Sequence, residues 1–278
     1  MDNKLNQSNI SENEIERPLR QEQRLDGITE LVLASGTVKI EDLVEQFQVS
    51  GMTIHRDLDL LDTRGILRKS RGYATAIASS LFEANPEYRQ RQNIFEKEML
   101  AQTAFKLVEP GQSLILDDST TVIHLAKLLV QKQPLTVITN FQKTVDVLKN
   151  APGISVVSLG GHYYQWSDAY MGAMTVNSLR SIRADMLFMS TPSIIDEICF
   201  HQHHEAALVK QAMFESAGKR YLLADHSKFE QRAVHSTIKL ENFDGVILDS
   251  LVSAKHVEHL RQKGINVILS GNDLPFQA

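Results

Sequence analysis

Residues 50–58 read Ser-Gly-Met-Thr-Ile-His-Arg-Asp-Leu, a run whose residue types suit contact with DNA. Ser50 can cap the start of a helix, because its hydroxyl accepts a hydrogen bond from a backbone N–H that the first turn leaves unpaired. On that helix Arg56 projects away from the apolar side, with Thr53 and His55 beside it. Such side chains bond base edges and phosphate oxygens when a helix lies in the major groove. We therefore predict DNA contacts from Thr53, His55 and Arg56.

Three apolar stripes at helical spacing would position this helix. Two precede it, a turn at Gln48-Val49 separates the second from the third, and the third lies on the helix itself. Their members are Leu25, Ile28 and Val32, then Ile40, Leu43, Val44 and Phe47, then Ile54, Leu58 and Leu61. Three short amphipathic helices, the last with a polar outer face, predict a helix-turn-helix.

A basic hairpin is predicted directly after the third helix. Gly65 ends that helix, and two short extended pieces follow around a basic tip. Residues 64–71 contain four basic residues and no acidic one, so we predict a β-wing that contacts DNA through Arg68, Lys69 and Arg71. Short helices and solvated charges are common by themselves. Here the stripes, the turn and the wing follow one another in the order that a winged helix-turn-helix requires.

The composition limits the class of protein. The chain has 278 residues, of which 42% are hydrophobic and 23% charged, as expected for a globular protein with one large or two smaller domains. No apolar run reaches the roughly 18–20 residues of a membrane helix, and residues 1–16 lack the apolar core of a signal peptide. The single cysteine, Cys199, excludes an intrachain disulfide, and we expect a core or loop thiol rather than a nucleophile. We predict a cytoplasmic protein that contacts no membrane.

The formal net charge of −5 does not exclude a DNA-binding protein. Affinity for phosphates depends on a local basic surface rather than on the charge of the whole chain. The acidic remainder would repel DNA from the other faces.

The chain from about residue 90 alternates short apolar runs with helical patterns. The runs are continuously apolar and rich in β-branched residues, as in parallel strands covered on both faces. They lie at 114–116, 135–138, 154–157, 186–189, 221–223, 246–248 and 265–269, with helical patterns at 122–130, 142–149 and 206–217. This alternation predicts an α/β domain with a mostly parallel sheet.

The predicted segments are four. They are a disordered tail at 1–17, the winged helix-turn-helix domain at 18–76, a linker at 77–92 that contains Asn85-Pro86, and an α/β effector-sensing domain at 93–278.

Polar residues follow the predicted strands at their carboxyl ends, where ligands bind in such sheets. Hydroxyl residues at the start of a helix can donate to a phosphate, although plain helix capping is the simpler explanation for each one alone. Lysines at neighbouring strand ends would add charge, although most lysines are surface charges. The candidate effector-binding residues are Asp117, Ser119, Thr120, Thr121, Thr139, Asn140, Gly160, Gly161, Lys210 and Lys228.

These motifs resemble those of the DeoR family of bacterial regulators over nearly the whole chain from residue 20. The N-terminal family pattern is Val-Ser, two variable residues, then Thr-Ile-Arg-Arg-Asp-Leu. It is matched at Val49, Ser50, Thr53, Ile54, Arg56, Asp57 and Leu58, and in the wing at Gly72 and Ala74. The effector-domain pattern is matched at Asp117, Thr120, Thr121, Thr139, Asn140, Leu159, Gly160, Gly161, Lys210, Ala224, Asp225, Ser227, Lys228 and Phe229.

The resemblance implies a fold similar to ribose-5-phosphate isomerase and CoA transferases, used to sense a phosphorylated sugar. The chain departs from the family at His55, where arginine is usual, and at Tyr164, where a basic residue is common. Asp118-Ser119 replaces Ser-Gly, and residues 190–193 replace a Gly-Ala-x-Gly turn. The last three departures suggest an unusual effector or a weakly responding pocket.

We predict a DNA-binding transcriptional regulator, a repressor of a carbohydrate-utilisation operon that a phosphorylated sugar releases from its operator. A homo-oligomer, dimer or tetramer, is expected because paired half-sites multiply the limited specificity of one helix. The alternative is a sugar-phosphate isomerase or transferase with an appended DNA-binding segment, for which Asp117, Asp118 and Glu205 would be the acid/base candidates. A third possibility is a DNA-bound scaffold that has lost its ligand.

No cofactor and no metal are predicted. His201, His203 and His204 with Glu205 have the residue types of metal ligands, but histidines in loops are far more common than metal sites.

Overall fold

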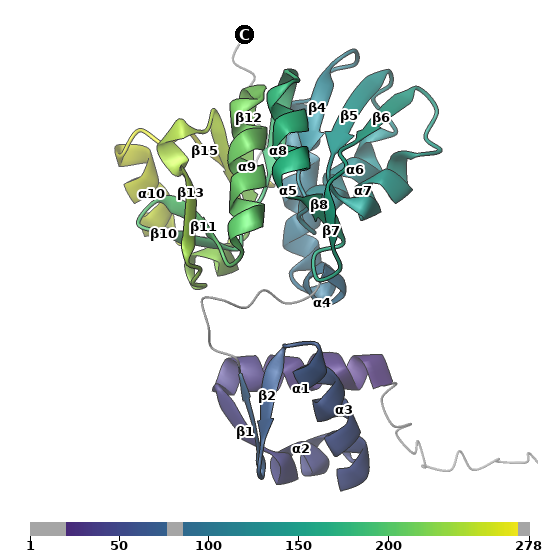
Figure 1. The fold of residues 1–278 in the computed structure, drawn as a ribbon. Coiled ribbons are helices and arrows are strands. Elements are labelled where there is room, and N and C mark those ends of the chain that lie inside the picture. The colour runs from purple at the N-terminus through teal and green to yellow at the C-terminus, as the bar shows by residue number, and fades with distance from the viewer. Residues whose placement is uncertain (1–20, 77–85, 272–278) are drawn as a thin grey trace, which may run out of the picture. The chain divides into compact units, whose positions relative to one another are not determined.

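The computed structural model describes residues 21–76 and 86–271, which belong to two units, residues 1–77 and 78–278 (Figure 1). The tail predicted at 1–17 lies outside the described residues.

The three apolar stripes of the first unit form three helices around one small core. They are α1 (Gln21–Ser35), α2 (Ile40–Phe47) and α3 (Gly51–Thr63). Every stripe residue is buried except Val44 and Phe47, which are partly buried. Gln48 adopts a left-handed conformation (φ +51°) in the turn between α2 and α3, and Gly65 (φ +68°) follows the end of α3. The helix-turn-helix prediction is confirmed.

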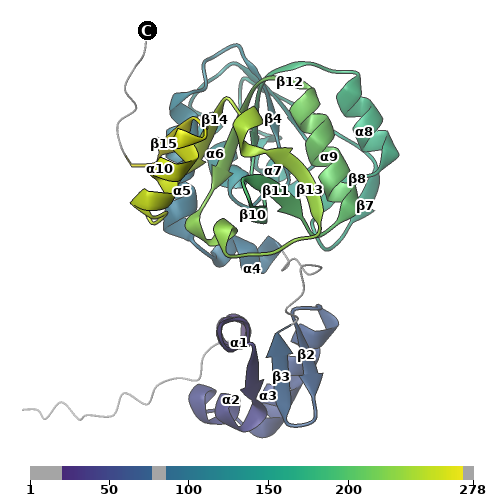
Figure 2. The same ribbon diagram turned by 90° about the vertical axis from the view of Figure 1, so that its left-hand side faces the viewer.

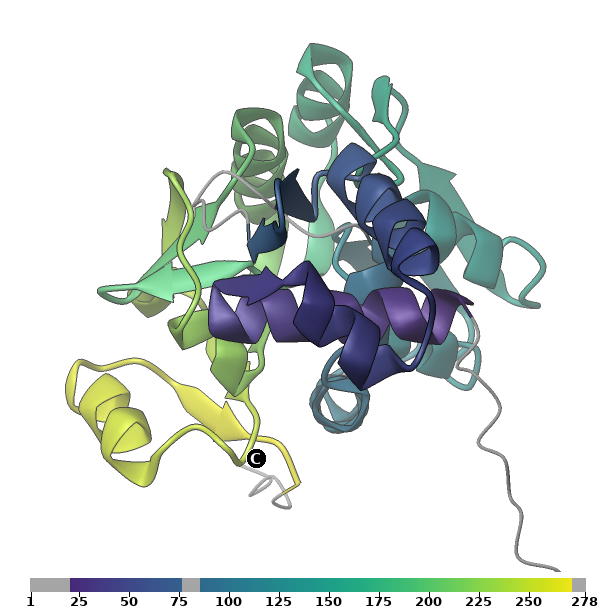
Figure 3. The same ribbon diagram turned by 90° about the horizontal axis from the view of Figure 1, so that it is seen from below.

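The predicted wing is an antiparallel hairpin of β2 (Leu67–Ser70) and β3 (Tyr73–Ala76). Gly72 adopts φ +81° in its turn, a conformation that favours glycine. A strand that the sequence analysis did not predict, β1 (Thr37–Lys39), pairs with β3 and completes a three-stranded sheet. Helix α1 packs against α3 and against strands β1 and β3 (Figures 1 and 3).

The second unit is built on a seven-stranded sheet in which all neighbouring strands are parallel. Its order is β15-β14-β12-β9-β4-β5-β6. The strands are β4 (Ser113–Leu116), β5 (Leu135–Thr139), β6 (Ile154–Ser158), β9 (Ala184–Met189), β12 (Ala217–Ala224), β14 (Gly245–Leu248) and β15 (Val267–Leu269). Each of the seven predicted apolar runs is one of these strands, so the predicted α/β architecture is confirmed.

Helices cover both faces of this sheet (Figures 1 and 2). One face carries α5 (Ile94–Lys106), α6 (Val122–Leu129) and α7 (Gln142–Leu148), and the other carries α8 (Ala173–Arg180), α9 (His204–Glu215) and α10 (Ala254–Gln262). Alternate side chains of a strand enter the two cores, so Leu114 and Leu116 pack on the α5–α6 side and Ile115 on the α9 side.

Several small elements were not predicted. Two antiparallel sheets flank the unit, one of β7 (His162–Tyr164) and β8 (Ala169–Met171), the other of β10 (Ser193–Ile195), β11 (Ile198–His201) and β13 (His235–Lys239). Two short 3-10 helices, η1 (His226–Phe229) and η2 (Leu240–Asn242), adjoin β13.

Helix α4 (Pro86–Arg91) occupies part of the segment predicted as a linker. Proline is favoured at the first position of a helix, where its missing N–H costs nothing, so Pro86 starts a helix instead of marking only a break. Across the described residues, no helix is long and apolar enough to cross a membrane.

Candidate DNA-binding surface and effector site

The outer face of α3 carries the predicted DNA contacts. Ser50 caps this helix as expected: its hydroxyl accepts a hydrogen bond from the Thr53 N–H at 3.2 Å and lies 2.9 Å from the Thr53 hydroxyl. The side chains of His55 and Arg56 are exposed on the side away from the core. The first turn is therefore fixed by its cap, and the basic residues one turn later are open to a partner.

A buried ion pair fixes α3 to α1. Arg24 Nε lies 2.6 Å from Asp57 Oδ2, and the Gln21 amide donates to Asp57 Oδ1 at 3.3 Å. Asp57 is 1% exposed. Asp57 was predicted only as part of a motif, and this positioning role was not. Its place on the buried stripe with Ile54 and Leu61 was the available signal.

The wing divides its basic residues between two tasks. Arg68 and Arg71 are exposed. Lys69, predicted to contact DNA, lies 2.5 Å from Asp59 Oδ1, and its ammonium also donates to the His55 carbonyl at 3.2 Å. The structure therefore gives Lys69 a partner within the protein, which docks the wing on α3.

The second site lies along the carboxyl edge of the parallel sheet. The segments that follow β4, β5, β6, β9 and β12 all begin there, as the sequence analysis expected for an all-parallel sheet. Its buried polar residues include Asp117, Asp118, Ser119, Thr120, Thr121, Thr139, Asn140, Ser190, Lys210 and Asp225.

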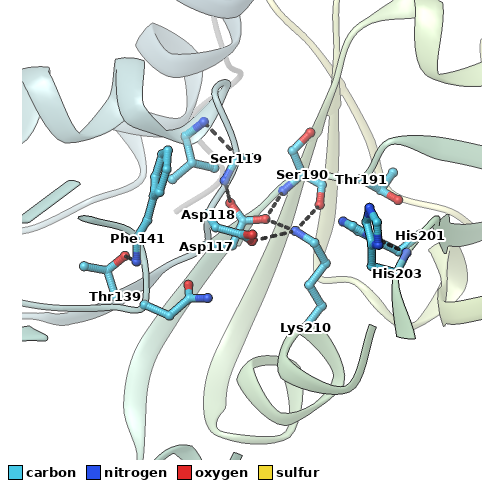
Figure 4. Close-up of polar contacts among 12 residues, drawn as sticks. Asp117, Asp118, Ser119, Thr139, Phe141, Ser190, Thr191, His201, His203 and Lys210 are labelled. Atoms are coloured by element: carbon cyan, nitrogen blue, oxygen red, sulfur yellow. Dashed lines mark hydrogen bonds and ion pairs between the residues drawn. The ribbon is translucent and has the colours of Figure 1, made fainter. Parts of the chain in front are cut away.

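Lys210 of α9 stands between two carboxylates at this edge (Figure 4). Its Nζ lies 2.5 Å from Asp117 Oδ2 and 3.5 Å from Asp118 Oδ1, and it donates to the Ser190 carbonyl at 3.1 Å. The Ser190 N–H in turn donates to Asp117 Oδ2 at 2.9 Å. These contacts connect the ends of β4 and β9 to α9 through one buried cluster of charged side chains.

The two carboxylates differ in their proton affinity. Burial raises the pKa of Asp117 above its ordinary value, although the Lys210 ammonium opposes this. Burial would also raise the pKa of Asp118, but the charges of Lys210, His201 and Arg89 outweigh it and lower that pKa. The pKa of Asp118, the residue that departs from the family pattern, is therefore shifted in the opposite direction to that of Asp117.

The loop before α6 contains a capping hydroxyl and two further buried hydroxyl residues. The Ser119 hydroxyl accepts a hydrogen bond from the Val122 N–H at 3.1 Å, and the Ser119 N–H donates to Asp117 Oδ1 at 3.1 Å. Ser119, predicted to contact an effector, is thus used as a cap. Thr120 and Thr121 are 5% and 2% exposed and lie at the start of the helix.

The ends of β5 and β6 contribute structural contacts and one buried acceptor. The Thr139 hydroxyl accepts from the Phe141 N–H at 3.1 Å, and the Asn140 amide donates to the Tyr170 carbonyl at 3.0 Å. Asn140 Oδ1 is buried with no hydrogen-bond partner among the described residues. A ligand hydroxyl would remove the cost of that unpaired acceptor.

The two glycines after β6 have different environments. A Cβ on Gly161 would lie 2.2 Å from the Thr175 hydroxyl and 2.6 Å from the Met171 carbonyl, so close packing explains this glycine. A Cβ on Gly160 would meet open space. Neither glycine was predicted for its packing.

A group of cations lies around Asp225, after β12. Lys228 Nζ is 3.6 Å from Asp225 Oδ2, and the Asn93 amide donates to Asp225 Oδ1 at 3.1 Å. Lys97 of α5, 3% exposed, donates to the Arg89 carbonyl. Burial lowers the pKa of Lys97 to about 7, with help from the nearby Lys228 and Arg89 charges and against the pull of Asp225. The sequence analysis found Lys228 but missed Lys97 and Arg89.

The other residues that departed from the pattern have protein contacts. The Thr191 hydroxyl donates to the Ser193 and Phe200 carbonyls at 3.1 and 3.0 Å, and Tyr164 lies edge-on to Trp166 with ring centres 6.0 Å apart. Trp166 stacks on His203 at 3.8 Å.

The three histidines predicted as candidate metal ligands have other contacts. His201 Nδ1 accepts from the His203 N–H at 3.1 Å, and the His204 ring lies 5.2 Å from that of His235. A different group, Asp225, His226 and Asp249, has ligand atoms within 4.8 Å of one another. Asp249 accepts there from two backbone N–H groups and contacts the His226 ring at 3.1 Å, so hydrogen bonding explains the arrangement.

Cys199 is buried, and burial raises the pKa of its thiol to about 12. It is the unreactive thiol that the sequence analysis expected.

Known proteins resemble the chain over both units. Residues 24–80 match the family described as the DeoR-like helix-turn-helix domain, and residues 92–250 match the DeoR C terminal sensor domain. The chain is 30% identical over 252 residues to the putative aga operon transcriptional repressor of Escherichia coli O157:H7, covering 90% of this chain and 94% of that protein. It is 31% identical over 230 residues to the lactose phosphotransferase system repressor of Staphylococcus epidermidis, covering 82% and 91%.

Two further similarities complete the comparison. The transcriptional repressor AccR of Agrobacterium fabrum is 30% identical over 226 residues, covering 80% of this chain and 87% of that protein. Among solved structures, ribose 5-phosphate isomerase A from Methanocaldococcus jannaschii has a TM-score of 0.37 at 15% identity, covering 50% of this chain and 55% of that one.

Proposed function

The chain belongs to the DeoR family of transcriptional regulators, and from this premise we propose that it represses a carbohydrate-utilisation operon and leaves its operator when a phosphorylated sugar binds. The relatives described above are named as repressors, one of them of the aga operon and one of a lactose phosphotransferase system. The chain is accordingly a regulator, and the alternative of an isomerase or transferase is set aside.

DNA binding rests on the exposed basic face of α3. His55 and Arg56 point away from the core, and Arg68 and Arg71 extend the same chemistry onto the wing. The buried Arg24–Asp57 pair holds α3 in place for docking. We propose that α3 enters the major groove and that the wing arginines contact phosphates.

Two half-sites are part of the proposal. One recognition helix contacts few base pairs, so a homo-oligomer that presents two such helices supplies the specificity that an operator needs.

Effector binding rests on the buried polar edge of the sheet. The phosphate would lie between Lys97, Lys228 and the hydroxyls of Thr120 and Thr121 at the start of α6. The excess of positive charge around Asp225 favours a dianion there. This keeps Thr120, Thr121 and Lys228 of the predicted effector-binding residues and adds Lys97. Asp117 and Asp118 would not contact the phosphate, because their carboxylates would repel it.

The sugar hydroxyls would bind on the other side of the same edge. Asp118 and Asn140 Oδ1 are buried acceptors, and a polyol supplies the donors that they need. Lys210 is paired with Asp117. It therefore holds the acceptor groups in position and does not neutralise the charge of the ligand.

The DNA half of the proposal is tested with duplexes selected from a random library by the full chain. Arg56→Ala removes a base or phosphate contact worth about 1–3 kcal/mol at each of two half-sites, a loss of at least roughly 30-fold in affinity. Arg180→Ala, an exposed arginine on α8, is the matched control and should bind like wild type. Binding by Arg56→Ala within threefold of wild type at fixed salt contradicts this role.

The effector half is tested by thermal shift against phosphorylated sugars and their unphosphorylated forms. A ligand at 100 times its Kd stabilises by about 2.7 kcal/mol, so a binder is readily detected. Thr120→Ala with Thr121→Ala should keep operator binding and lose the response to the sugar phosphate. Lys228→Ala should do the same, whereas Lys255→Ala, an exposed lysine on α10, should change nothing.

Release of DNA requires that the sugar phosphate prefer the state that does not bind the operator. A differential binding energy of about 3 kcal/mol gives roughly a hundredfold loss of affinity for DNA. If no phosphorylated sugar stabilises a chain that binds its operator, the chain is the ligand-free scaffold considered above.

A further inference from the structure

Met52 is an apolar side chain on the outer face of α3, where it does not contribute to the protein core. It is 68% exposed, whereas the inner stripe of Ile54, Leu58 and Leu61 is at most 1% exposed. Helical spacing places Met52 on the same side as His55 and Arg56, three and four residues later. Exposure alone does not distinguish Met52, since Met174 of α8 is 71% exposed; its position at the head of the basic stripe on α3 is what points to a contact outside the protein.

In the first turn of α3, Met52 is the side chain that can extend furthest from the helix. Gly51 has no side chain, and the Thr53 hydroxyl lies 2.9 Å from that of Ser50 in the capping arrangement. Met52 is the second residue of the helix and is not drawn into the cap. In helix-turn-helix proteins the N-terminal residues of this helix contact base edges.

Thymine is the base that presents an apolar group in the major groove, its C5 methyl. Methionine is unbranched and polarisable and adapts its shape to such a group. We infer that Met52 contacts the C5 methyl of a thymine in each operator half-site and so selects thymine at that position. The inference rests on the proposed docking of α3 in the major groove.

This contact would add sequence discrimination that the wing arginines lack. Contacts of Arg68 and Arg71 with phosphates carry no sequence information, whereas a methyl contact separates thymine from the other three bases. Removing a single buried methyl group weakens binding roughly fourfold, and roughly fifteenfold for two half-sites.

The experiment replaces thymine by uracil, which removes only the methyl group. The full chain first selects its operator from random duplexes, and each thymine is then changed to uracil one symmetric pair at a time. For one pair, wild type should lose roughly fifteenfold in affinity. Met52→Ala should bind the thymine operator as wild type binds the uracil operator, and should show no further loss on uracil substitution.

Two variants complete the design. Met52→Leu keeps an apolar side chain of similar size and should retain most of the discrimination. Met174→Ala, which removes a methionine 71% exposed on α8, should behave like wild type. Alanine at an exposed helix position favours folding, so Met52→Ala should remain folded.

The outcomes separate this inference from the proposed function. If the chain selects an operator but Met52→Ala loses the same factor as wild type at every uracil position, the thymine contact is wrong and DNA binding stands. If Met52→Ala changes the oligomeric state measured by light scattering but leaves the loss of affinity on uracil substitution unchanged, Met52 contacts a second copy of the chain instead. If no duplex is selected, the proposed DNA binding fails, and the inference fails with it.

Discussion

Asp57→Ala removes one half of a buried ion pair, and we expect it to unfold the DNA-binding unit well below the wild-type temperature. Asp57 is 1% exposed and lies 2.6 Å from Arg24, whose side chain is 9% exposed. The substitution removes the buried carboxylate of this pair and leaves the largely buried guanidinium without it. Such changes cost about 3–5 kcal/mol.

Asp59→Ala is a matched control from the same helix. Asp59 also pairs with a cation, Lys69, at 2.5 Å, but its side chain is 66% exposed. Exposed pairs contribute about 0–1 kcal/mol, because water screens the charges. The two substitutions therefore remove the same chemical group at nearly the same distance from a cation and differ in burial.

Calorimetry of the full chain measures the difference. For a domain of this size each kcal/mol moves the midpoint by about 4–8 °C, so Asp57→Ala should shift the transition of the first unit by about 12 °C or more. Asp59→Ala should shift it by a few degrees at most. The double variant Arg24→Met with Asp57→Leu should recover most of the loss, since an apolar pair of similar size replaces both charges. Equal shifts for Asp57→Ala and Asp59→Ala would refute the claim that burial sets the strength of these pairs.

Three further predictions concern the second unit. Burial and the charges of Lys228 and Arg89 lower the pKa of Lys97 to about 7, against the effect of Asp225 and Glu96, so Lys97 loses its charge as pH rises from 7 to 9. The affinity for a sugar phosphate, measured by titration calorimetry, should therefore fall over that range. Lys97→Arg should reduce this pH dependence, because arginine stays charged. Gly161→Ala should lower the melting temperature through its clash with Met171, whereas Gly160→Ala should leave it unchanged; equal melting of the two variants would contradict the packing argument. Cys199, with its thiol pKa raised to about 12 by burial, should react with a thiol reagent only after denaturation, and rapid labelling of the native chain would show that the thiol is accessible.

The architecture could be predicted because apolar periodicity reports directly on burial. All seven strands of the large sheet were found as continuous apolar runs, since both faces of that sheet are covered by helices. The small antiparallel sheets were missed, because strands such as β7 (His162–Tyr164) and β10 (Ser193–Ile195) are three residues long. A segment that short shows no period, and only its partner strand makes it a strand.

The candidate sites could be located by residue type, but the pairing of side chains could not. Lys69 and Ser119 are of residue types that often bind ligands. In the structure, however, Lys69 pairs with Asp59, and Ser119 caps the N-terminus of α6. Asp59 is ten residues from Lys69 along the chain and became its partner only when the wing folded onto α3. Arg89 was missed because it lies on α4, in a segment assigned to a linker.

One sequence signal would have found three of the missed or uncertain residues. Asp57, Lys97 and Lys210 are 1%, 3% and 3% exposed, and each lies on the apolar stripe of its helix. The stripes are Ile54-Asp57-Leu58-Leu61, Lys97-Leu100-Ala101-Ala104 and Ala206-Val209-Lys210-Met213, all with spacing i, i+3, i+4, i+7. A charged residue at such a position must be buried when the helix packs, and a buried charge needs a partner or a ligand.

Asp57 has Arg24 and Lys210 has Asp117, whereas Lys97 lies beside Lys228 with Asp225 as their shared carboxylate. The same rule that identifies two structural ion pairs therefore leaves Lys97 short of negative charge, which is why we place the phosphate of the effector there.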